Sequence, residues 1–181
     1  MNNEQLLQMY DAIRQQPDLL VKAAARKRLI NFARYMQPDL VLEPFHVVYY
    51  TLLDMFAHGK IRKMIVQQPP QHGKSEGSSR KLPAFMLGLD PDRKICIGSY
   101  AATIARDFNR DVQRIIDTPR YRELFPGTYL NGSNVVTMAN TYLRNSDVIE
   151  MVGRKGSLRV VGRGGSLTSK TVDVSILDDV Y

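Results

Sequence analysis

The stretch from Met64 to Glu76 constrains the fold of this chain most strongly, because an apolar run leads directly into a glycine-lysine-serine turn. Residues 63–67 have the length and apolar content of a short buried strand. Residues 76–88 can form a helix despite Gly77 and Pro83. A strand that passes through a tight turn into a helix is the local structure of a phosphate-binding loop. The alternative is an ordinary strand–turn–helix corner.

The turn itself matches the second half of the pattern G-x-x-x-x-G-K-[ST]. Gly73 lets the backbone approach a phosphate, Lys74 has the length to reach β- and γ-phosphates, and the Ser75 hydroxyl suits Mg²⁺. The free N–H groups at the start of the following helix would complete an anion site. Gln68 stands where the pattern has its first glycine, so the match is incomplete.

A second chemical element lies near the end of the chain, where the apolar run 172–177 leads into Asp178 and Asp179. In a phosphate-loop enzyme such a strand lies beside the loop strand, so we expect its carboxylates to face the loop. Asp178 would then hold Mg²⁺, and Asp179 would orient or deprotonate the attacking water. The alternative is that both acids only cap a surface strand, and the upstream loop argues against it.

The order of the predicted elements indicates an α/β fold, because strands and helices alternate first and short strands follow. Such an order favours a mainly parallel sheet with an antiparallel addition. We expect helices at about 3–16, 18–36, 45–58, 76–88, 101–117 and 118–124, and strands at 63–67, 94–98, 135–138, 148–152, 158–161 and 172–177.

Composition limits the class of protein. The 181 residues are enough for one domain with a core, and 44% hydrophobic and 24% charged residues are typical of a soluble globular protein. No apolar run has the length of a membrane span, and the first residues lack the features of a secretory signal. The single cysteine, Cys96, cannot form an internal disulfide. A reducing cytoplasm fits these features.

The formal net charge of +7 permits a nucleic-acid partner through its phosphate backbone. Basic residues concentrate at 22–28 and 154–163. Such a charge also serves solubility alone, so each cluster has the alternative interpretation of a solvated basic face.

Several motifs occur together in one order, and they are Pro44-Phe45-His46, 69–76, 97–100, 164–168 and 176–179. In that order they resemble the ATPase half of viral terminase large subunits, the motors that package double-stranded DNA into procapsids of tailed bacteriophages. The resemblance covers nearly the whole chain from about Leu40 onward. It implies a P-loop NTPase fold of the additional-strand, RecA- and helicase-like kind, with a mainly parallel central sheet flanked by helices. The helices predicted before Pro44 make up an N-terminal helical extension (1–43), and the resemblance implies an ATPase core (44–181) truncated after the Walker B strand.

The resemblance further implies ATP and Mg²⁺ as cofactors. It assigns catalysis to Lys74 and Asp179 and the metal to Ser75 and Asp178. The implied nucleotide-binding residues are Gln71, His72, Gly73, Lys74, Ser75, Glu76 and His46. Of these, His46 falls near the position of an adenine-contacting glutamine, with a histidine on the edge of an apolar helix as the alternative. We do not expect a catalytic role for the His72 side chain.

Two departures from the family pattern concern side chains of the predicted site. Many relatives carry an arginine just before the Gly-Lys pair, where this chain has Pro70 and Gln71, and Asp179 stands where the family often has glutamate. An arginine that neutralises transition-state charge can come from a neighbouring subunit. Arg163 and Lys170 are the candidates in this chain, with basic residues on exposed turns as the alternative.

The resemblance also implies partners, namely double-stranded DNA, a portal protein and a small terminase subunit, with a homo-oligomeric ring in the intact motor. The expected location is the cytoplasm of an infected bacterial host. Tyr181 follows Asp179 by two residues, so we expect a fragment or a shortened gene product that lacks the coupling motif and the nuclease domain. The alternatives are another DNA-dependent P-loop ATPase of the superfamily 2 helicase kind, and a nucleotide-binding assembly module without turnover.

Overall fold

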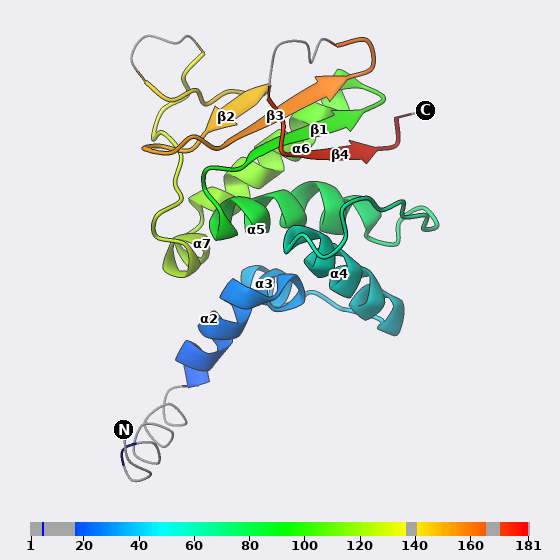
Figure 1. Ribbon diagram of the computed structural model, residues 1–181, viewed down its shortest axis with the longest axis vertical. Coiled ribbons are helices and arrows are strands. Elements are labelled where there is room, and N and C mark those ends of the chain that lie inside the picture. Colours follow the sequence, from blue (N-terminus) through cyan, green and yellow to red (C-terminus); the bar gives the residue numbers. More distant parts are fainter. Residues whose placement is uncertain (1–4, 6–16, 137–140, 166–170, 181) are drawn as a thin grey trace.

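The structure is a computed structural model that describes residues 5, 17–136, 141–165 and 171–180. Figure 1 shows a sheet at one end of the molecule, N-terminal helices at the other, and α5 between them. The helices are α2 (Pro17–Lys27), α3 (Leu29–Met36), α4 (Pro44–Ala57), the π-helix η1 (Glu76–Lys81), α5 (Leu82–Leu89), α6 (Ala102–Asp117) and α7 (Pro119–Leu124). The strands are β1 (Lys94–Ser99), β2 (Val148–Glu150), β3 (Ser157–Gly162) and β4 (Val174–Asp178).

The described strands form one sheet in the order β2-β3-β1-β4. β1 pairs in parallel with β3 on one side and with β4 on the other, so that Ile97 lies opposite both Val160 and Ile176. β2 runs antiparallel to β3. The prediction of a mixed α/β protein with a mainly parallel sheet and an antiparallel addition is therefore confirmed.

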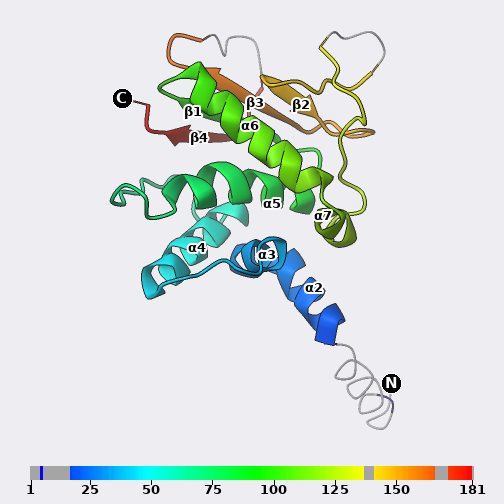
Figure 2. The same cartoon turned by 180° about the vertical axis from the view of Figure 1, so that it is seen from behind.

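The two faces of this sheet differ because side chains alternate along each strand. One face consists of apolar residues that join the core, and its buried members include Ile95, Ile97, Ile149, Leu158 and Ile176. Figure 2 shows α6 lying across this face. The other face has no described helix in front of it in Figure 1, and charged and polar side chains occupy several of its positions.

The core continues from the sheet into the helical layers through a cluster of aromatic rings. Phe85 of α5 lies at its centre, with its ring centroid 5.4 Å from that of Phe32 in α3 and 6.4 Å from that of Phe125. Tyr121 of α7 packs edge-on against Phe32, and its hydroxyl donates to the Ala84 carbonyl at 2.8 Å. Burial raises the pKa of the Tyr121 hydroxyl, which therefore stays a donor.

One predicted strand is wrong. Residues 63–67 form no strand, although Met64 and Val66 turn toward the core and Ile65 is 91% exposed. The alternation of a strand is present, but a strand also needs a paired neighbour for its N–H and C=O groups. β4 pairs with β1 only, so within the described residues no strand lies beside residues 63–67.

One predicted helix is divided. Residues 18–36 form α2 and α3, because Arg28 has an extended backbone with φ −134° and ψ 128°. The break lets the N–H of Leu29, at the start of α3, donate to the Asp54 carboxylate of α4 at 2.8 Å. The Arg28 guanidinium lies 3.2 Å from the other oxygen of Asp54. A buried carboxylate from another helix thus caps α3, which local sequence could not show.

The remaining predicted elements are confirmed with small shifts at their ends, except at three places. Residues 76–88 begin as the π-helix η1 before α5. Val135 forms only an isolated bridge with Arg144, and residues 137–138 lie outside the described residues. The predicted helix at 3–16 also lies outside them, apart from Gln5. The domain division after residue 43 stays a prediction.

The aromatic cluster gives a stability prediction. Phe85→Ala removes a fully buried ring from the junction of α3, α5 and α7, so we expect the free energy of unfolding to fall by about 3–5 kcal/mol. Val48→Ala on the exposed side of α4 serves as the control and should change it by less than about 0.5 kcal/mol. Urea unfolding of the full chain measures both. Equal effects of the two substitutions would contradict the central role of Phe85.

Candidate functional site

The loop between α4 and η1 contains a glycine, Gly73, at a position where the backbone is left-handed. Gly73 has φ 74°, a left-handed conformation that glycine adopts without strain. A Cβ at this position would also lie 3.4 Å from Nε2 of His46, so the loop packs closely against the start of α4. Gln71 has φ 63° and takes up the same conformation as a non-glycine residue. The backbone at Gly73 therefore favours glycine, and Gln71 adopts the same conformation at a steric cost.

Side chains of α4 and η1 hold the loop in place. The Tyr49 hydroxyl of α4 donates to the Lys74 carbonyl at 2.6 Å, and the Ser78 hydroxyl donates to the same oxygen at 2.9 Å. Burial raises the pKa of Tyr49 to about 12, so its hydroxyl remains a donor at neutral pH. Gly77 makes this contact possible, because a Cβ there would lie 2.6 Å from the Tyr49 ring.

The Lys74 side chain connects the loop to the end of β4. Its ammonium group donates to the Asp179 carboxylate and lies 3.5 Å from Oδ1 of Asp178. The hydrogen bond to Asp179 raises the pKa of Lys74 most, burial opposes it, and the nearby charges of Asp178 and Asp179 raise the pKa further. The lysine therefore stays charged, and the loop and both predicted acids form one cluster.

The two carboxylates have different environments. The Asp178 side chain is only 3% exposed, and its Oδ2 accepts a hydrogen bond of 2.7 Å from the Ser79 hydroxyl. The Asp179 side chain is 76% exposed, and its backbone has φ 46°. Asp178 is therefore held in a fixed position, whereas Asp179 faces solvent beside the loop. Sequence reasoning missed Ser79, which lies four residues after Ser75 on the same helix.

A hollow of about 450 Å³ adjoins this cluster and is lined by loop residues together with Arg80 and Asp179. The predicted site residues in its lining are Gln71, Gly73, Lys74, Ser75, Glu76 and Asp179. His46 and His72 lie outside the lining. The His72 ring packs 5.6 Å from that of Phe45, and its Nδ1 lies 2.8 Å from the Pro70 carbonyl. The structure therefore gathers the loop residues and one acid around a cavity, with both histidines beside it.

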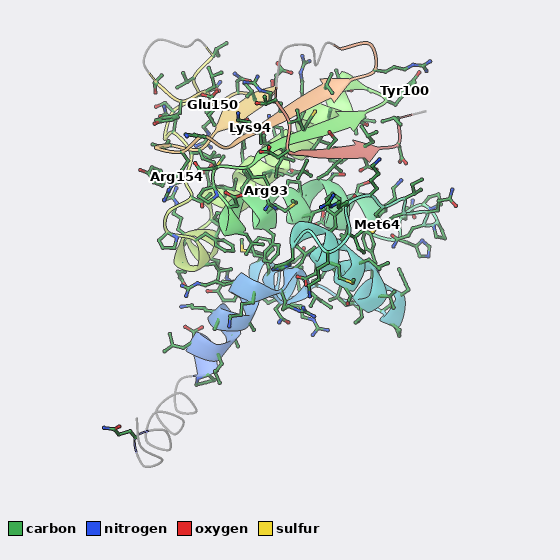
Figure 3. All side chains as sticks on the ribbon, in the orientation of Figure 1. Met64, Arg93, Lys94, Tyr100, Glu150 and Arg154 are labelled. Atoms are coloured by element: carbon green, nitrogen blue, oxygen red, sulfur yellow. The ribbon has the colours of Figure 1, made fainter. Side chains whose placement is uncertain are left out.

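The cations near this hollow differ in their freedom. The Arg80 guanidinium lies 2.7 Å from Asp111 of α6 and 4.9 Å from the centre of the Phe108 ring, so α6 holds it. Arg163 directly follows the carboxyl end of β3, and backbone hydrogen bonds link it through Tyr100 to Asp179 at the end of β4. The Arg163 N–H donates to the Tyr100 carbonyl, and the Tyr100 N–H donates to the Asp179 carbonyl. In Figure 3 Tyr100 marks this edge of the sheet. Lys170 lies outside the described residues.

The donor set of the cluster fits a metal that is shared with phosphates. Among the described residues, no three or more histidine, cysteine, aspartate or glutamate side chains are grouped so that together they could hold a metal ion. The described side chains therefore form no complete protein cage for a metal. Mg²⁺ characteristically uses one or two carboxylates together with substrate phosphates and water. The fixed carboxylate of Asp178 and the nearby hydroxyls supply such oxygen donors, whereas the Lys74 ammonium is available to neutralise phosphate charge.

Comparisons of the chain with protein-family models, curated proteins and solved structures find no match. Among the helices that the structure describes, none has the length and apolar content needed to cross a membrane. The function of the chain is therefore inferred from the arrangement of the residues in the candidate site.

The hydrogen bond between Ser79 and Asp178 gives a prediction with a matched control. Ser79→Ala leaves a buried carboxylate without its hydroxyl donor, so we expect the free energy of unfolding to fall by about 1.5–3 kcal/mol. Ser78→Ala should cost less, because the Lys74 carbonyl keeps the Tyr49 hydroxyl as a donor. Urea unfolding without nucleotide measures both. A larger loss for the Ser78 variant would contradict this account.

Proposed function

We propose that the chain is a P-loop ATPase, namely the ATP-hydrolysing region of a DNA-packaging motor of the viral terminase type. One observation carries the proposal: Lys74 meets Asp178 and Asp179, although 105 residues separate Lys74 from Asp179. Parallel strands β1, β3 and β4 support it, because ligands of open α/β sheets bind at the carboxyl ends of such strands. The proposal includes the additional-strand, RecA- and helicase-like form of this fold.

The proposed cofactors are ATP and Mg²⁺, bound in the hollow beside the loop. Gly73 allows the backbone to approach the phosphates, and Lys74 brings a positive charge to them. Ser75 and Asp178 are the proposed metal residues. Mg²⁺, when bound, neutralises charge on the phosphates of the nucleotide. Gln71, Glu76 and the neighbouring His46 and His72 complete the proposed nucleotide surroundings.

Asp178 and Asp179 have different roles in the proposed reaction. Ser79 keeps the buried Asp178 in place, while the exposed Asp179 exchanges its contact with Lys74 for one with water. Phosphates carry more negative charge than a single carboxylate, so they compete well for the Lys74 ammonium. Asp179, once released, accepts a hydrogen bond from the attacking water and orients it. Phosphoryl transfer needs mostly such positioning and charge neutralisation.

The proposed partners are those of a packaging motor: double-stranded DNA, a portal protein, a small terminase subunit and further copies of the chain in a ring. The net charge of +7 supports a DNA partner. Arg80 is held by Asp111, so the charge-neutralising arginine would come from a neighbouring copy. Arg163, exposed beside the Asp179 edge, is a candidate, as is Lys170. The proposed location is the cytoplasm of an infected bacterium.

A second candidate function is a nucleotide-binding assembly module without turnover. The observation that favours it is again Arg80, the one arginine in the lining of the hollow among the described residues, whose guanidinium α6 already engages. A chain that receives no cation from a neighbour would bind nucleotide and not hydrolyse it. Binding without phosphate release, with or without duplex DNA, would favour this module over the motor.

The ATPase proposal predicts that two substitutions separate binding from turnover. Lys74→Ala should weaken ATP binding by at least about tenfold, because it removes a charged donor to the phosphates. Asp179→Asn should retain binding and lower phosphate release by about 10²–10⁴-fold, because an amide is a poor base. Calorimetric titration of Mg·ATP and a phosphate-release assay, each with and without duplex DNA, measure these effects.

Lys60→Ala is the control, because this exposed lysine lies in the turn after α4 and lines no part of the hollow. It should leave both measurements unchanged. Failure of the folded wild-type chain to bind ATP would contradict the proposal, as would a Lys74→Ala variant that binds as tightly as the wild type.

A further inference from the structure

The sheet face without a described helix carries a second hollow, of about 380 Å³, at the amino ends of β1 and β3. Four cationic side chains line it, and they are Lys94, Arg154, Lys155 and Arg159. Glu150 is the one acidic residue in its described lining. Figure 3 shows Lys94, Glu150 and Arg154 on the side of the molecule away from Tyr100. The hollow is therefore separate from the loop cluster, which lies at the carboxyl ends of the strands.

Of the four cations of this hollow, Arg159 alone has an ion pair among the described residues, with Glu150. The Lys94 ammonium donates to the Thr171 hydroxyl at 2.8 Å, a neutral partner. Within the part of the chain that the structure describes, no carboxylate oxygen lies within 4.0 Å of the charged nitrogens of Lys94, Arg154 or Lys155. Like charges that share a hollow raise the free energy of the empty site, and an anion relieves that repulsion.

The carboxylates at this end of the sheet have partners other than the side chains of Lys94, Arg154 and Lys155. The Glu150 side chain lies 3.9 Å from the Arg159 guanidinium through Oε1, and its Oε2 accepts from the Leu143 N–H at 3.0 Å. Two further acids at this edge serve the backbone. Asp92 accepts from the Lys155 N–H and Asp173 accepts from the Lys94 N–H, each at 2.8 Å. Asp92 and Asp173 thus hold the strand ends in place, and the charged groups of Lys94, Arg154 and Lys155 stay available for an anion.

We propose that this basic hollow binds phosphate groups of a nucleic-acid backbone. Arginine and lysine side chains from β1, β3 and the turn before β3 converge there, and a phosphodiester is the anion that such a set fits best. Arg154 and Lys155 are exposed, so the hollow opens to solvent, and a polymer can enter and leave it. Contacts of this kind carry no base information, so binding is independent of sequence.

This inference uses none of the residues of the loop cluster, so it holds whether or not the chain hydrolyses ATP. Where both proposals hold, the hollow is a place at which the motor contacts DNA. It then lies at the opposite edge of the sheet from the nucleotide, and β1 runs from one site to the other.

Fluorescence anisotropy of a fluorescein-labelled, mixed-sequence DNA duplex tests this proposal on the full chain. We expect Arg154→Gln/Lys155→Gln to weaken binding by at least about tenfold at low salt. It should also reduce the slope of log K against log salt by about 2, since each lost phosphate contact removes about 1 from that slope. Lys60→Gln/Arg62→Gln is the matched control, because it removes the same charge from an exposed turn outside the hollow.

The control pair should change the affinity by less than about twofold. An equal loss in both pairs would assign binding to general charge and overturn the proposal, as would a wild-type chain that does not bind the duplex. Orthophosphate titrated into the same proteins is the second arm. If orthophosphate binds in the hollow and the duplex does not, the proposal that the ligand is a nucleic-acid backbone is overturned.

Failure of this inference can be told apart from failure of the ATPase proposal. The Arg154→Gln/Lys155→Gln variant should bind Mg·ATP as the wild type does, and Lys74→Ala should bind the duplex as the wild type does. Circular dichroism melts establish that each variant folds. If the double variant does not fold, Lys155→Gln alone, at an exposed turn, should lower the salt slope by about 1.

Discussion

The pairing of β1 on both of its edges is the constraint on which the rest of the structure depends. β1 is almost completely buried and pairs in parallel with β3 and β4. Parallel strands end at the same edge of a sheet, so this pairing brings Ser99, Gly162 and Asp178 to one side of the molecule. At the opposite edge it brings together Lys94 and Ser157, where the basic hollow lies. The loop cluster and the basic hollow therefore lie at opposite ends of β1.

The loop cluster is held by side chains rather than by a strand before the loop. Tyr49 and Ser78 bind the Lys74 carbonyl, and the Lys74 ammonium reaches the two acids at the carboxyl end of β4. The loop is thus connected to α4 at one end and to β4 at the other. Because Asp178 is buried and Asp179 is exposed, a single lysine contacts one fixed and one accessible carboxylate. The two roles proposed for these acids depend on that asymmetry.

The distribution of charge follows the two faces of the sheet. Apolar side chains turn toward α6 and the helical core, whereas Lys94 and Arg159 occupy the face that no described helix covers. Around the loop, acids and cations are paired closely, as in the contacts of Glu76 with Lys81 and of Asp111 with Arg80. Around the basic hollow, by contrast, most cations keep neutral partners or none among the described residues. The cations near the loop are therefore mostly paired with acids, whereas most of those near the basic hollow are not.

The amino-acid sequence by itself determined most of the elements and the members of the loop cluster. Gly73, Lys74, Asp178 and Asp179 were identifiable as candidates because the phosphate-loop pattern places those residue types after apolar runs. The buried strands and amphipathic helices followed from periodicity, since apolar spacing reflects local geometry. Local patterns carry this information because each depends on residues only a few positions apart.

Only the tertiary structure decided how these parts are held. Residues 63–67 have the alternation of a strand, yet pairing requires a neighbour, and none lies beside them in the described part of the chain. The break at Arg28 depends on Asp54, and the position of Asp178 depends on Ser79, which is 99 residues away in the sequence. The basic hollow likewise requires β1 and β3 to lie side by side. Such contacts join distant residues, and their energies depend on packing that no local pattern records.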